Sequence, residues 1–443
     1  MYDDNNILIF GFGVTGQAAL KCMNHFNANI YVYDEDKEKL EKYGNDIFKI
    51  FKEEYLDKID FIIKSPGINP DHPLLKKARE NKVAIKSDLE IFYEICKSKN
   101  TVAITGTNGK TTTTSLIASI LEEVGKTYCV GNIGNSVLDA ALVASEDDYV
   151  VIEASSFQLD DTYKFRPKIA VVTNVTSDHL DWHKTVENYR NAKYKIFKNQ
   201  NEDDYIVFNS KNQELSNKEI KSQKYKFSTD EVLENGSFIQ DGKIYFSKNS
   251  IKEEIMPVDE IKIPGAHNLE NILCAVNACK LLGIDKAIIR KVISNFMGVE
   301  HRIEFVKEIK GVKYYNDSKG TNPDSTIMAI KAIDKNIVLI AGGYDKNANY
   351  EEFLKVGKDR VKHLILLGET AEKIQKEAKK LDYDIYIVSD MKKAVQLSSR
   401  IAEEGDTVLL SPACASWDMY PSYEIRGKDF KNLVNELIWW RNY

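Results

Sequence analysis

The stretch that decides the fold is Gly106-Thr107-Asn108-Gly109-Lys110-Thr111-Thr112. A strand-like apolar run, Thr101–Thr105, precedes it, and a helical pattern from Thr111 to about Glu123 follows. Small residues let the backbone N–H groups of such a loop point at phosphate oxygens, and the positive end of the next helix adds to the attraction. Lys110 supplies a mobile cation, and the Thr111 hydroxyl can bind Mg²⁺. The stretch therefore predicts a strand–loop–helix unit that binds ATP.

The pattern departs at one position from the commonest form of such loops, because Ile104 stands where that form has its first glycine. A Gly-Lys-Thr turn that arose by chance is the alternative interpretation. The order of strand, glycine loop, Lys-Thr pair and helix favours the phosphate loop.

A second glycine turn, Gly11-Phe12-Gly13-Val14-Thr15-Gly16, follows a predicted strand and opens a predicted helix. Asp34 ends the next strand, at the spacing of a dinucleotide-binding fingerprint. The turn predicts a phosphate or pyrophosphate at a helix N-terminus and a ribose or base near Asp34. NAD, FAD and a nucleotide-diphosphate sugar all meet that description, and a βα turn without a ligand is a further alternative.

Short apolar runs alternate with helical patterns over most of the 443 residues, which indicates βαβ units on parallel sheets. Residues 200–260 are rich in strand patterns, and a hairpin is expected around Gly311. We expect three α/β domains in series: a Rossmann-like domain over 1–96, a central P-loop ATPase domain over 97–298 and a Rossmann-like domain over 299–443. The expected strands are 7–10, 30–33, 61–64, 101–105, 149–152, 169–173, 337–340, 363–367, 385–388 and 407–410, and the main expected helices are 17–26, 111–123 and 267–282.

Composition narrows the function classes. The formal net charge of -6 would repel a nucleic-acid backbone, so no nucleic-acid partner is expected. Six scattered cysteines form no C-x-x-C pair, which predicts neither a zinc knuckle nor a disulfide framework. No leader pattern and no apolar stretch of membrane-spanning length occurs in the sequence. We expect a cytoplasmic protein that does not bind membranes.

Several residues are candidates for a metal centre. Glu153 ends a predicted strand, and His179 follows another, so both would lie at the carboxyl edge of a sheet, where such folds bind ligands. Oxygen ligands suit Mg²⁺, so Glu153 with Thr111 is a sensible pair, whereas a histidine is less typical. A zinc pair of His179 and His183 is an alternative, although the glutamate of H-E-x-x-H is absent. Lys193 considered alone is most simply a solvated helix lysine.

The last third of the chain places polar loops after its predicted strands. These loops carry the cations Lys319 and Lys346, and Arg302 opens the region. Three cations in a net acidic chain would suit a carboxylate substrate or a γ-phosphate. Surface lysines and turn residues are the alternative interpretation of the individual positions.

Twelve motifs follow one another along the chain: the turn 11–16, Ser65-Pro66-Gly67-Ile68, Thr105–Thr112, Gly131-Asn132-Ile133-Gly134, Glu153–Leu159, Asn174–His179, Tyr189–Lys193, Gly265-Ala266-His267-Asn268 through Asn271, His301-Arg302, Asn316–Asn322, Ser411–Asp418 and Arg426-Gly427. In this order they resemble the Mur ligases of peptidoglycan synthesis, over essentially the whole chain. The incomplete glycine pattern at residue 104 is the form that this family uses.

The resemblance implies an ATP-dependent ligase with an N-terminal UDP-binding domain, a central ATP-binding domain and a C-terminal amino-acid-binding domain. ATP would phosphorylate the carboxylate of UDP-N-acetylmuramoyl-L-alanine. The amine of D-glutamate would attack the acyl phosphate, and the tetrahedral intermediate would collapse to the amide with release of ADP and phosphate. Both substrates are small molecules, and we expect a monomer.

The resemblance also implies roles for individual residues. The catalytic set would be Lys110, Glu153, His179 and Lys193. ATP would be bound by Gly106, Thr107, Asn108, Gly109, Lys110, Thr111, Thr112, Asn271, Arg302 and Asp317. Two Mg²⁺ ions would be held, one by Thr111 and Glu153 and one by His179 and a carbamylated Lys193. The UDP substrate would contact Val14, Thr15, Asp34, Ser65 and Asn132, and D-glutamate would contact Lys319, Thr321, Lys346, Ser416, Trp417 and Tyr423.

Other functions compete with this one. Within the superfamily, the L-alanine-adding ligase and folylpolyglutamate synthetase are alternatives, but the motif Ser411–Asp418 and the N-terminal turn favour the D-glutamate-adding type. A nicotinamide dehydrogenase would explain the turn at 11–16 and leave the phosphate loop without a role. A P-loop switch protein would explain the loop and leave the N-terminal turn and the third domain without one.

Overall fold

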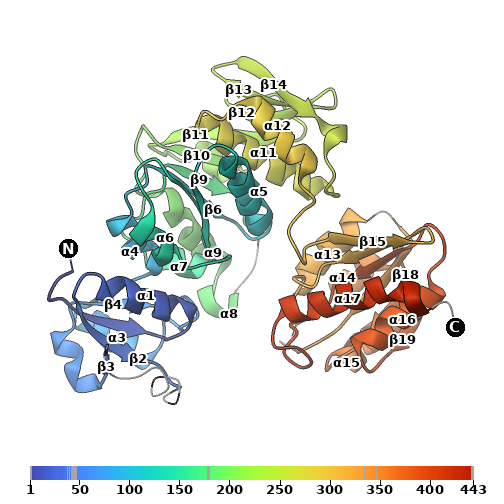
Figure 1. The fold of residues 1–443 in the computed structure, drawn as a ribbon, viewed down its shortest axis with the longest axis horizontal. Coiled ribbons are helices and arrows are strands. Elements are labelled where there is room, and N and C mark those ends of the chain that lie inside the picture. Colours follow the sequence, from blue (N-terminus) through green and yellow to red (C-terminus); the bar gives the residue numbers. More distant parts are fainter. Residues whose placement is uncertain are drawn as a thin grey trace. The chain divides into compact units, whose positions relative to one another are not determined.

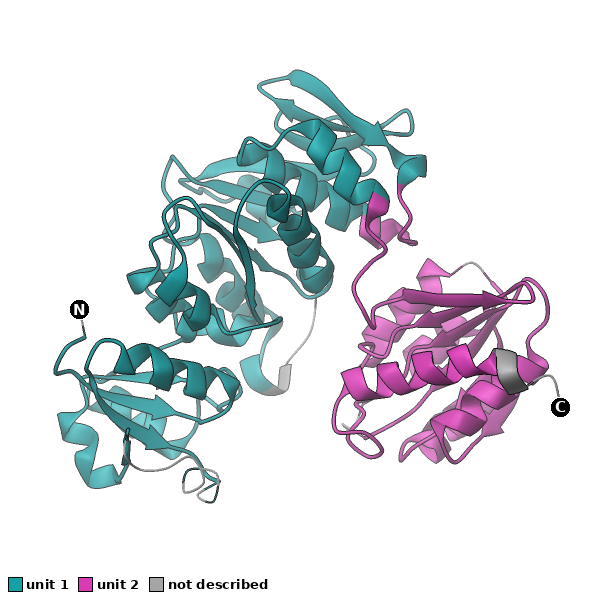
Figure 2. Cartoon of the chain, viewed as in Figure 1, with its two compact units in different colours: residues 1–260, 269–294 teal, residues 261–268, 295–443 magenta. Residues whose placement is uncertain are grey.

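The computed structural model describes residues 2–36, 38, 40, 47–176, 180–333, 335–345 and 348–440. These residues form two compact units (Figure 2): unit 1 is Met1–Glu260 with Leu269–Ser294, and unit 2 is Ile261–Asn268 with Asn295–Tyr443. Three separate sheets run through the chain in series, two in unit 1 and one in unit 2 (Figure 1). The prediction of three α/β domains in series is confirmed. The boundaries after residues 96 and 298 stay predictions.

The first sheet is parallel throughout, with strand order β3-β2-β1-β4-β5. Its core strand β1 alternates Leu8 and Phe10 on one face with Ile7 and Ile9 on the other, and all four are buried because helices cover both faces. The elements are β1 (Asn6–Phe10), α1 (Val14–Asn24), β2 (Asn29–Tyr33), β3 (Lys49–Ile50), η1 (Glu53–Lys58), β4 (Phe61–Lys64), α3 (Pro73–Glu80) and β5 (Ala84–Lys86).

The second sheet has the order β14-β13-β12-β11-β10-β9-β6-β8-β7. It is parallel from β7 to β12 and antiparallel across β12, β13 and β14. Its strands are β6 (Asn100–Thr105), β7 (Thr127–Gly131), β8 (Tyr149–Glu153), β9 (Ile169–Val172), β10 (Tyr205–Asn209), β11 (Gln223–Ser228), β12 (Gly236–Gln240), β13 (Lys243–Lys248) and β14 (Ile251–Pro257). Its helices are α4 (Asp88–Ile95), α5 (Lys110–Glu122), α6 (Val137–Val143), α7 (Ser156–Asp160), α8 (Leu180–His183), α9 (Val186–Tyr194), η2 (Lys195–Phe197), α10 (Gln213–Asn217), η3 (Val258–Glu260), α11 (Ala266–Leu281) and α12 (Lys286–Asn295).

The third sheet, in unit 2, has the order β15-β16-β20-β17-β18-β19, and only the hairpin β15–β16 is antiparallel. The long helix α17 packs its apolar face on this sheet (Figure 1). The elements are β15 (Glu304–Ile309), β16 (Val312–Asn316), α13 (Pro323–Ala332), β17 (Ile337–Ala341), α14 (Glu351–Gly357), β18 (Val361–Leu366), α15 (Ala371–Lys379), β19 (Ile385–Ile387), α16 (Met391–Ile401), β20 (Thr407–Leu410) and α17 (Tyr423–Trp440).

The strands and helices expected from the sequence are present, with small differences at their ends. The largest is at α1, which begins within the glycine turn 11–16, at Val14 instead of Gln17. No helix within the described residues is both long enough and apolar enough to cross a membrane.

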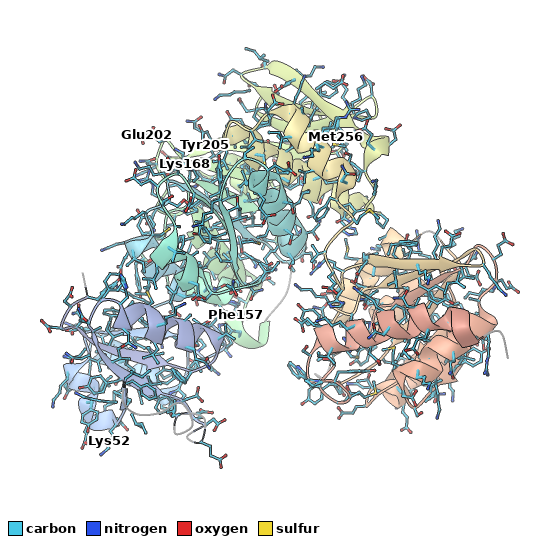
Figure 3. The ribbon with its side chains drawn as sticks, in the orientation of Figure 1. Lys52, Phe157, Lys168, Glu202, Tyr205 and Met256 are labelled. Atoms are coloured by element: carbon cyan, nitrogen blue, oxygen red, sulfur yellow. The ribbon has the colours of Figure 1, made fainter. Side chains whose placement is uncertain are left out.

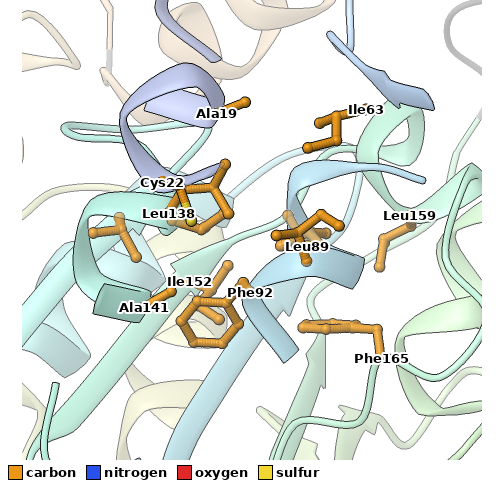
Figure 4. Packing of buried hydrophobic residues seen from close by; sticks show 14 of the residues in the cluster. Ala19, Cys22, Ile63, Leu89, Phe92, Leu138, Ala141, Ile152, Leu159 and Phe165 are labelled. Carbon is orange, nitrogen blue, oxygen red and sulfur yellow. The ribbon is translucent and has the colours of Figure 1, made fainter. Parts of the chain in front are cut away.

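The two sheets of unit 1 share one hydrophobic core. Cys22 on α1, Phe92 on α4 and Leu138 on α6 belong to a single buried cluster (Figure 4). An ion pair also joins the two domains, because the buried Lys64 ammonium at the end of β4 lies 3.1 Å from the carboxylate of Asp161, which follows α7. Burial of this apolar surface joins the first two domains into one compact unit.

The Asp88 carboxyl group lies in this junction and is fully buried. The Gln158 side-chain amide donates to both Asp88 oxygens, at 3.1 and 3.0 Å. Burial raises the pKa of Asp88 to about 6, although the hydrogen bond from Gln158 opposes the shift. The folded chain therefore binds the proton more tightly than the unfolded chain does.

Asp88 is predicted to make stability depend on pH. Its stabilising contribution is fully present below about pH 4 and is lost as the pH rises through 6, amounting to about 3 kcal/mol at most. The Asp88→Asn variant should lack this loss. The difference in free energy of unfolding, variant minus wild type, should therefore increase between pH 4 and pH 7. Denaturant titrations at both pH values measure this, with the exposed Asp203→Asn as the control. Parallel pH profiles for wild type and Asp88→Asn would contradict the prediction.

Candidate active site

The phosphate loop joins β6 to α5 and is closely packed from two sides. Gly106 and Gly109 both have positive φ, at +155° and +82°. A Cβ atom on Gly106 would lie 1.9 Å from Thr173 Oγ1, and one on Gly109 would lie 2.2 Å from Asn271 Oδ1. Asn271 also accepts a hydrogen bond from Thr113 Oγ1 at 3.3 Å. Only glycine fits at these two positions.

Two side chains after β9 fix the centre of the loop. Asn174 accepts from the Asn108 N–H at 2.9 Å and donates to the Asn108 carbonyl at 3.0 Å. Thr173 Oγ1 donates to the same carbonyl at 2.6 Å. Sequence reasoning placed Asn174 in a motif without giving it a role and passed over Thr173. Their position at the end of a strand beside β6 was the available signal.

Two lysines meet at one carbonyl of the loop. Lys110 Nζ donates to the Gly106 carbonyl at 2.8 Å and to the Thr107 carbonyl at 2.9 Å. Lys193, on α9, donates to the Gly106 carbonyl at 2.8 Å. Its side chain is 1% exposed, and its ammonium lies 4.5 Å from the centre of the Tyr189 ring. Lys193 is thus a buried group at the phosphate loop, and the alternative of a solvated lysine is wrong.

Glu153 ends β8 and is 1% exposed. Its Oε1 accepts from Asn132 Nδ2 at 2.9 Å, while its Oε2 is buried without a hydrogen-bond partner among the described residues. A buried carboxylate oxygen without a partner is costly unless a cation or donor binds it. The hydroxyl-bearing Thr111, also buried, lies in the first turn of α5. This donor set suits Mg²⁺, which prefers oxygen ligands.

Of the two histidines in the zinc alternative, the structure describes only His183. His179 lies outside the described residues. His183 Nε2 lies 3.0 Å from Ser156 Oγ, and its ring stacks on Phe157 (labelled in Figure 3) with planes 3° apart. His183 therefore has a hydrogen-bond partner and a packing role at α7.

The N-terminal glycine turn is held by the two side chains predicted to bind there. The Phe12 N–H donates to Asp34 Oδ2 at 2.5 Å, and Ser65 Oγ donates to the Gly11 carbonyl at 2.8 Å. Val14 is 75% exposed, and Thr15 is partly exposed at the first turn of α1. The four residues Val14, Thr15, Asp34 and Ser65 thus surround one helix N-terminus, the location favoured by a diphosphate.

In unit 2, Asp317 follows β16 and is fully buried. Its oxygens accept from Ser411 Oγ at 2.7 Å and from the Ile303 N–H at 3.3 Å. Burial raises its pKa to about 7, against the attraction of the Arg302 guanidinium. Arg302 Nε is itself buried without a hydrogen-bond partner among the described residues. Both Asp317 oxygens thus accept hydrogen bonds, whereas the Arg302 Nε–H group remains available to a ligand.

Five of the six residues predicted for D-glutamate lie in the described part of unit 2, in loops after its strands and at the start of α17. Lys319 Nζ lies 5.6 Å from the centre of the Tyr423 ring. Trp417 is 62% exposed, and its ring lies 5.5 Å from that of Tyr344. Ser416 is buried, Thr321 is partly exposed, and Lys346 lies outside the described residues. Tyr344 was missed by sequence reasoning, which singled out its loop only for its lysine.

Comparison with known protein families identifies the family that has this combination of three sheets and a phosphate loop. Residues 5–87 match the Mur ligase MurD-like N-terminal domain, residues 104–279 the Mur ligase middle domain, and residues 301–414 the Mur ligase glutamate ligase domain. The chain belongs to the Mur ligase family, whose members are ATP-dependent ligases of peptidoglycan precursors. A nicotinamide dehydrogenase and a P-loop switch protein are thereby excluded.

Sequence relatives indicate which type of Mur ligase this chain is most similar to among those compared. The UDP-N-acetylmuramoylalanine--D-glutamate ligase of Thermoanaerobacter sp. (strain X514) is 47% identical over 447 residues, covering 97% of this chain and 98% of the relative. The ligase of the same name from Clostridioides difficile (strain 630) is 42% identical over 448 residues, with 97% and 98% covered.

Solved structures agree on the fold. The UDP-N-acetylmuramate-alanine ligase MurC of Thermotoga maritima superimposes with a TM-score of 0.60 at 20% identity, covering 97% of this chain and 99% of that one. The MurF ligase of Thermotoga maritima in complex with ADP gives 0.60 at 17% identity, with 99% and 96% covered.

The packing of the phosphate loop generates a prediction. Gly109→Ala should lower ATP affinity at least about tenfold, because 1.4 kcal/mol suffices for that factor and the new Cβ displaces Asn271. Gly283→Ala is the matched control, since its φ is +80° but its Cβ meets no atom within 4 Å. Titration with a fluorescent ATP analogue compares the two. Equal affinity for both variants would show that the loop tolerates the side chain.

Proposed function

We propose that this chain joins D-glutamate to UDP-N-acetylmuramoyl-L-alanine, with conversion of ATP to ADP and phosphate through an acyl phosphate. The observation that carries the proposal is the sequence identity of 47% and 42%, over 97% of this chain, to two relatives whose names state that activity. The buried Glu153 and Lys193 near the glycine loop support the proposal. A site that activates a carboxylate needs anionic oxygen ligands for a metal ion and hydrogen-bond donors for the phosphate groups.

In this proposal the phosphate loop, Gly106–Thr112, binds ATP through its backbone N–H groups. Lys110 exchanges its two carbonyl contacts for phosphate oxygens, and so neutralises charge as the γ-phosphoryl group moves to the carboxylate. Bound Mg²⁺ would supply additional positive charge at the phosphates. Thr111 and Glu153 would hold one ion, and His179 with Lys193 the other. Asn271, Arg302 and Asp317 complete the nucleotide contacts.

Lys193 reaches its metal role only as a carbamate. Its amine adds to CO₂ with loss of a proton, which replaces a cation with an anionic oxygen pair. The carbamate nitrogen keeps one N–H, so the hydrogen bond to the Gly106 carbonyl can persist after the modification.

The remaining assignments concern the two acceptor substrates. Val14, Thr15, Asp34 and Ser65 bind the uridine diphosphate at the N-terminal turn, and Asn132 binds the muramoyl-alanine end beside Glu153. The loops of unit 2 bind D-glutamate through Lys319, Thr321, Lys346, Ser416, Trp417 and Tyr423. The three domains span 1–96, 97–298 and 299–443, and the enzyme acts as a cytoplasmic monomer.

The deciding experiment measures phosphate release from ATP with Mg²⁺ and UDP-N-acetylmuramoyl-L-alanine while each amino acid is offered in turn. We expect release that depends on D-glutamate, with L-glutamate and L-alanine inactive. A preference for another amino acid, or release without one, would refute the specific assignment.

The carbamate role has its own test. Lys193→Ala should lose essentially all ligase activity, and a small unbranched carboxylic acid such as acetate should restore part of it by filling the vacated space with an oxygen ligand. Lys195→Ala, two residues away and paired with Asp160 at 3.1 Å, serves as the control for acid effects. Full activity of Lys193→Ala without added acid would disprove the role.

A further inference from the structure

Arg426, on the first turn of α17, is the largest fully buried side chain of the described residues. It is 1% exposed, and no carboxylate forms an ion pair with it in the part of the chain that the structure describes. Burial lowers its pKa to about 10, so the guanidinium stays charged at neutral pH. A buried charge without an ion-pair partner is expensive unless its hydrogen bonds are complete.

The hydrogen bonds of Arg426 are complete and go to two loops. Nε donates to Ser318 Oγ at 3.0 Å, and Nη2 donates to the Ser318 carbonyl at 2.8 Å and to the Cys414 carbonyl at 3.2 Å. Nη1 donates to the carbonyls of Cys414 at 3.2 Å and Ala415 at 3.1 Å. All five N–H donors of the guanidinium are used.

Each of these contacts leads to a segment assigned to D-glutamate. Ser318 precedes Lys319, and its hydroxyl donates onward to the Tyr423 carbonyl at 2.8 Å. The Ala415 carbonyl also accepts from the Tyr344 N–H at 3.0 Å, which ties in the loop after β17. Arg426 therefore links the ends of β16, β17 and β20 with the start of α17.

The peptide geometry adds a second consequence. In a trans peptide the N–H points opposite to the carbonyl of the same unit. Because the Cys414 and Ala415 carbonyls face Arg426, the N–H groups of Ala415 and Ser416 point away from it. Ala415 pairs with Tyr344 in an isolated antiparallel bridge, so the Ser416 N–H is the donor of this segment that suits an anionic oxygen.

We propose that Arg426 is a positioning residue for the amino-acid substrate, fixing Lys319, Tyr423 and the Ala415–Ser416 peptide as one receptor for a dicarboxylate. The inference rests on the proposed function and deepens it. Arg426 acts through these groups and through its buried positive charge, which favours a doubly anionic amino acid over a neutral one.

Kinetics of the purified full-length enzyme test the proposal, with phosphate release as the readout and each of the three substrates varied in turn. Arg426→Lys keeps the charge but has three donors in place of five. We expect its KM for D-glutamate to rise at least about tenfold, while the KM values for ATP and for the UDP substrate change less than about twofold. Arg400→Lys, an exposed arginine on α16, is the matched control and should match the wild type.

Chemical rescue separates positioning from general structural support. In Arg426→Ala, millimolar guanidinium should lower the KM for D-glutamate, whereas equal concentrations of sodium chloride should not. An equal rise of all three KM values, or an unchanged KM for D-glutamate in Arg426→Lys, would overturn the proposal, and the lysine variant alone decides if the alanine variant is insoluble. Wild-type enzyme that releases phosphate without D-glutamate would instead refute the proposed function.

Discussion

The phosphate loop, Gly106–Thr112, depends on the carbonyl oxygen of Gly106. It accepts hydrogen bonds from Lys110 within the loop and from Lys193 on a helix far away in sequence. A carbonyl has two lone pairs, so both bonds can be made at once. Because there is no side chain at Gly106, the loop backbone comes close enough for Thr173 and Asn174 to form hydrogen bonds with Asn108. Contacts within the protein therefore hold the shape of the loop, and a preorganised loop loses less conformational entropy when a ligand binds.

Much of this architecture could be predicted from the sequence. The strand before residue 106, the helix after it and the βα alternation follow from hydrophobic periodicity, and the three-domain series was recovered from them. The location of Glu153 at a strand end also followed from the pattern. In contrast, the burial of Lys193 could not be deduced from a polar helical stretch, because only the tertiary contact with residue 106 reveals it.

The missed residues share a physical cause. Thr173, Asn174 and Arg426 act by hydrogen bonds to backbone carbonyls or N–H groups of other loops, and backbone partners have no residue-type signature in a sequence. Short polar residues at strand ends are also common in loops without function. Their roles become visible only when the register of β9 beside β6, or of β20 beside β17, brings the loops together.

The single core of unit 1 has a consequence for how such a chain can evolve. Cys22, Phe92 and Leu138 come from three segments separated in sequence, yet they fill one closely packed volume. An enlarged side chain on α1 must be matched by a reduced one on α4 or α6, since native interiors leave no spare space. The first domain therefore cannot be exchanged freely for that of a distant relative, and functional chimeras would have to carry α1, α4 and α6 together.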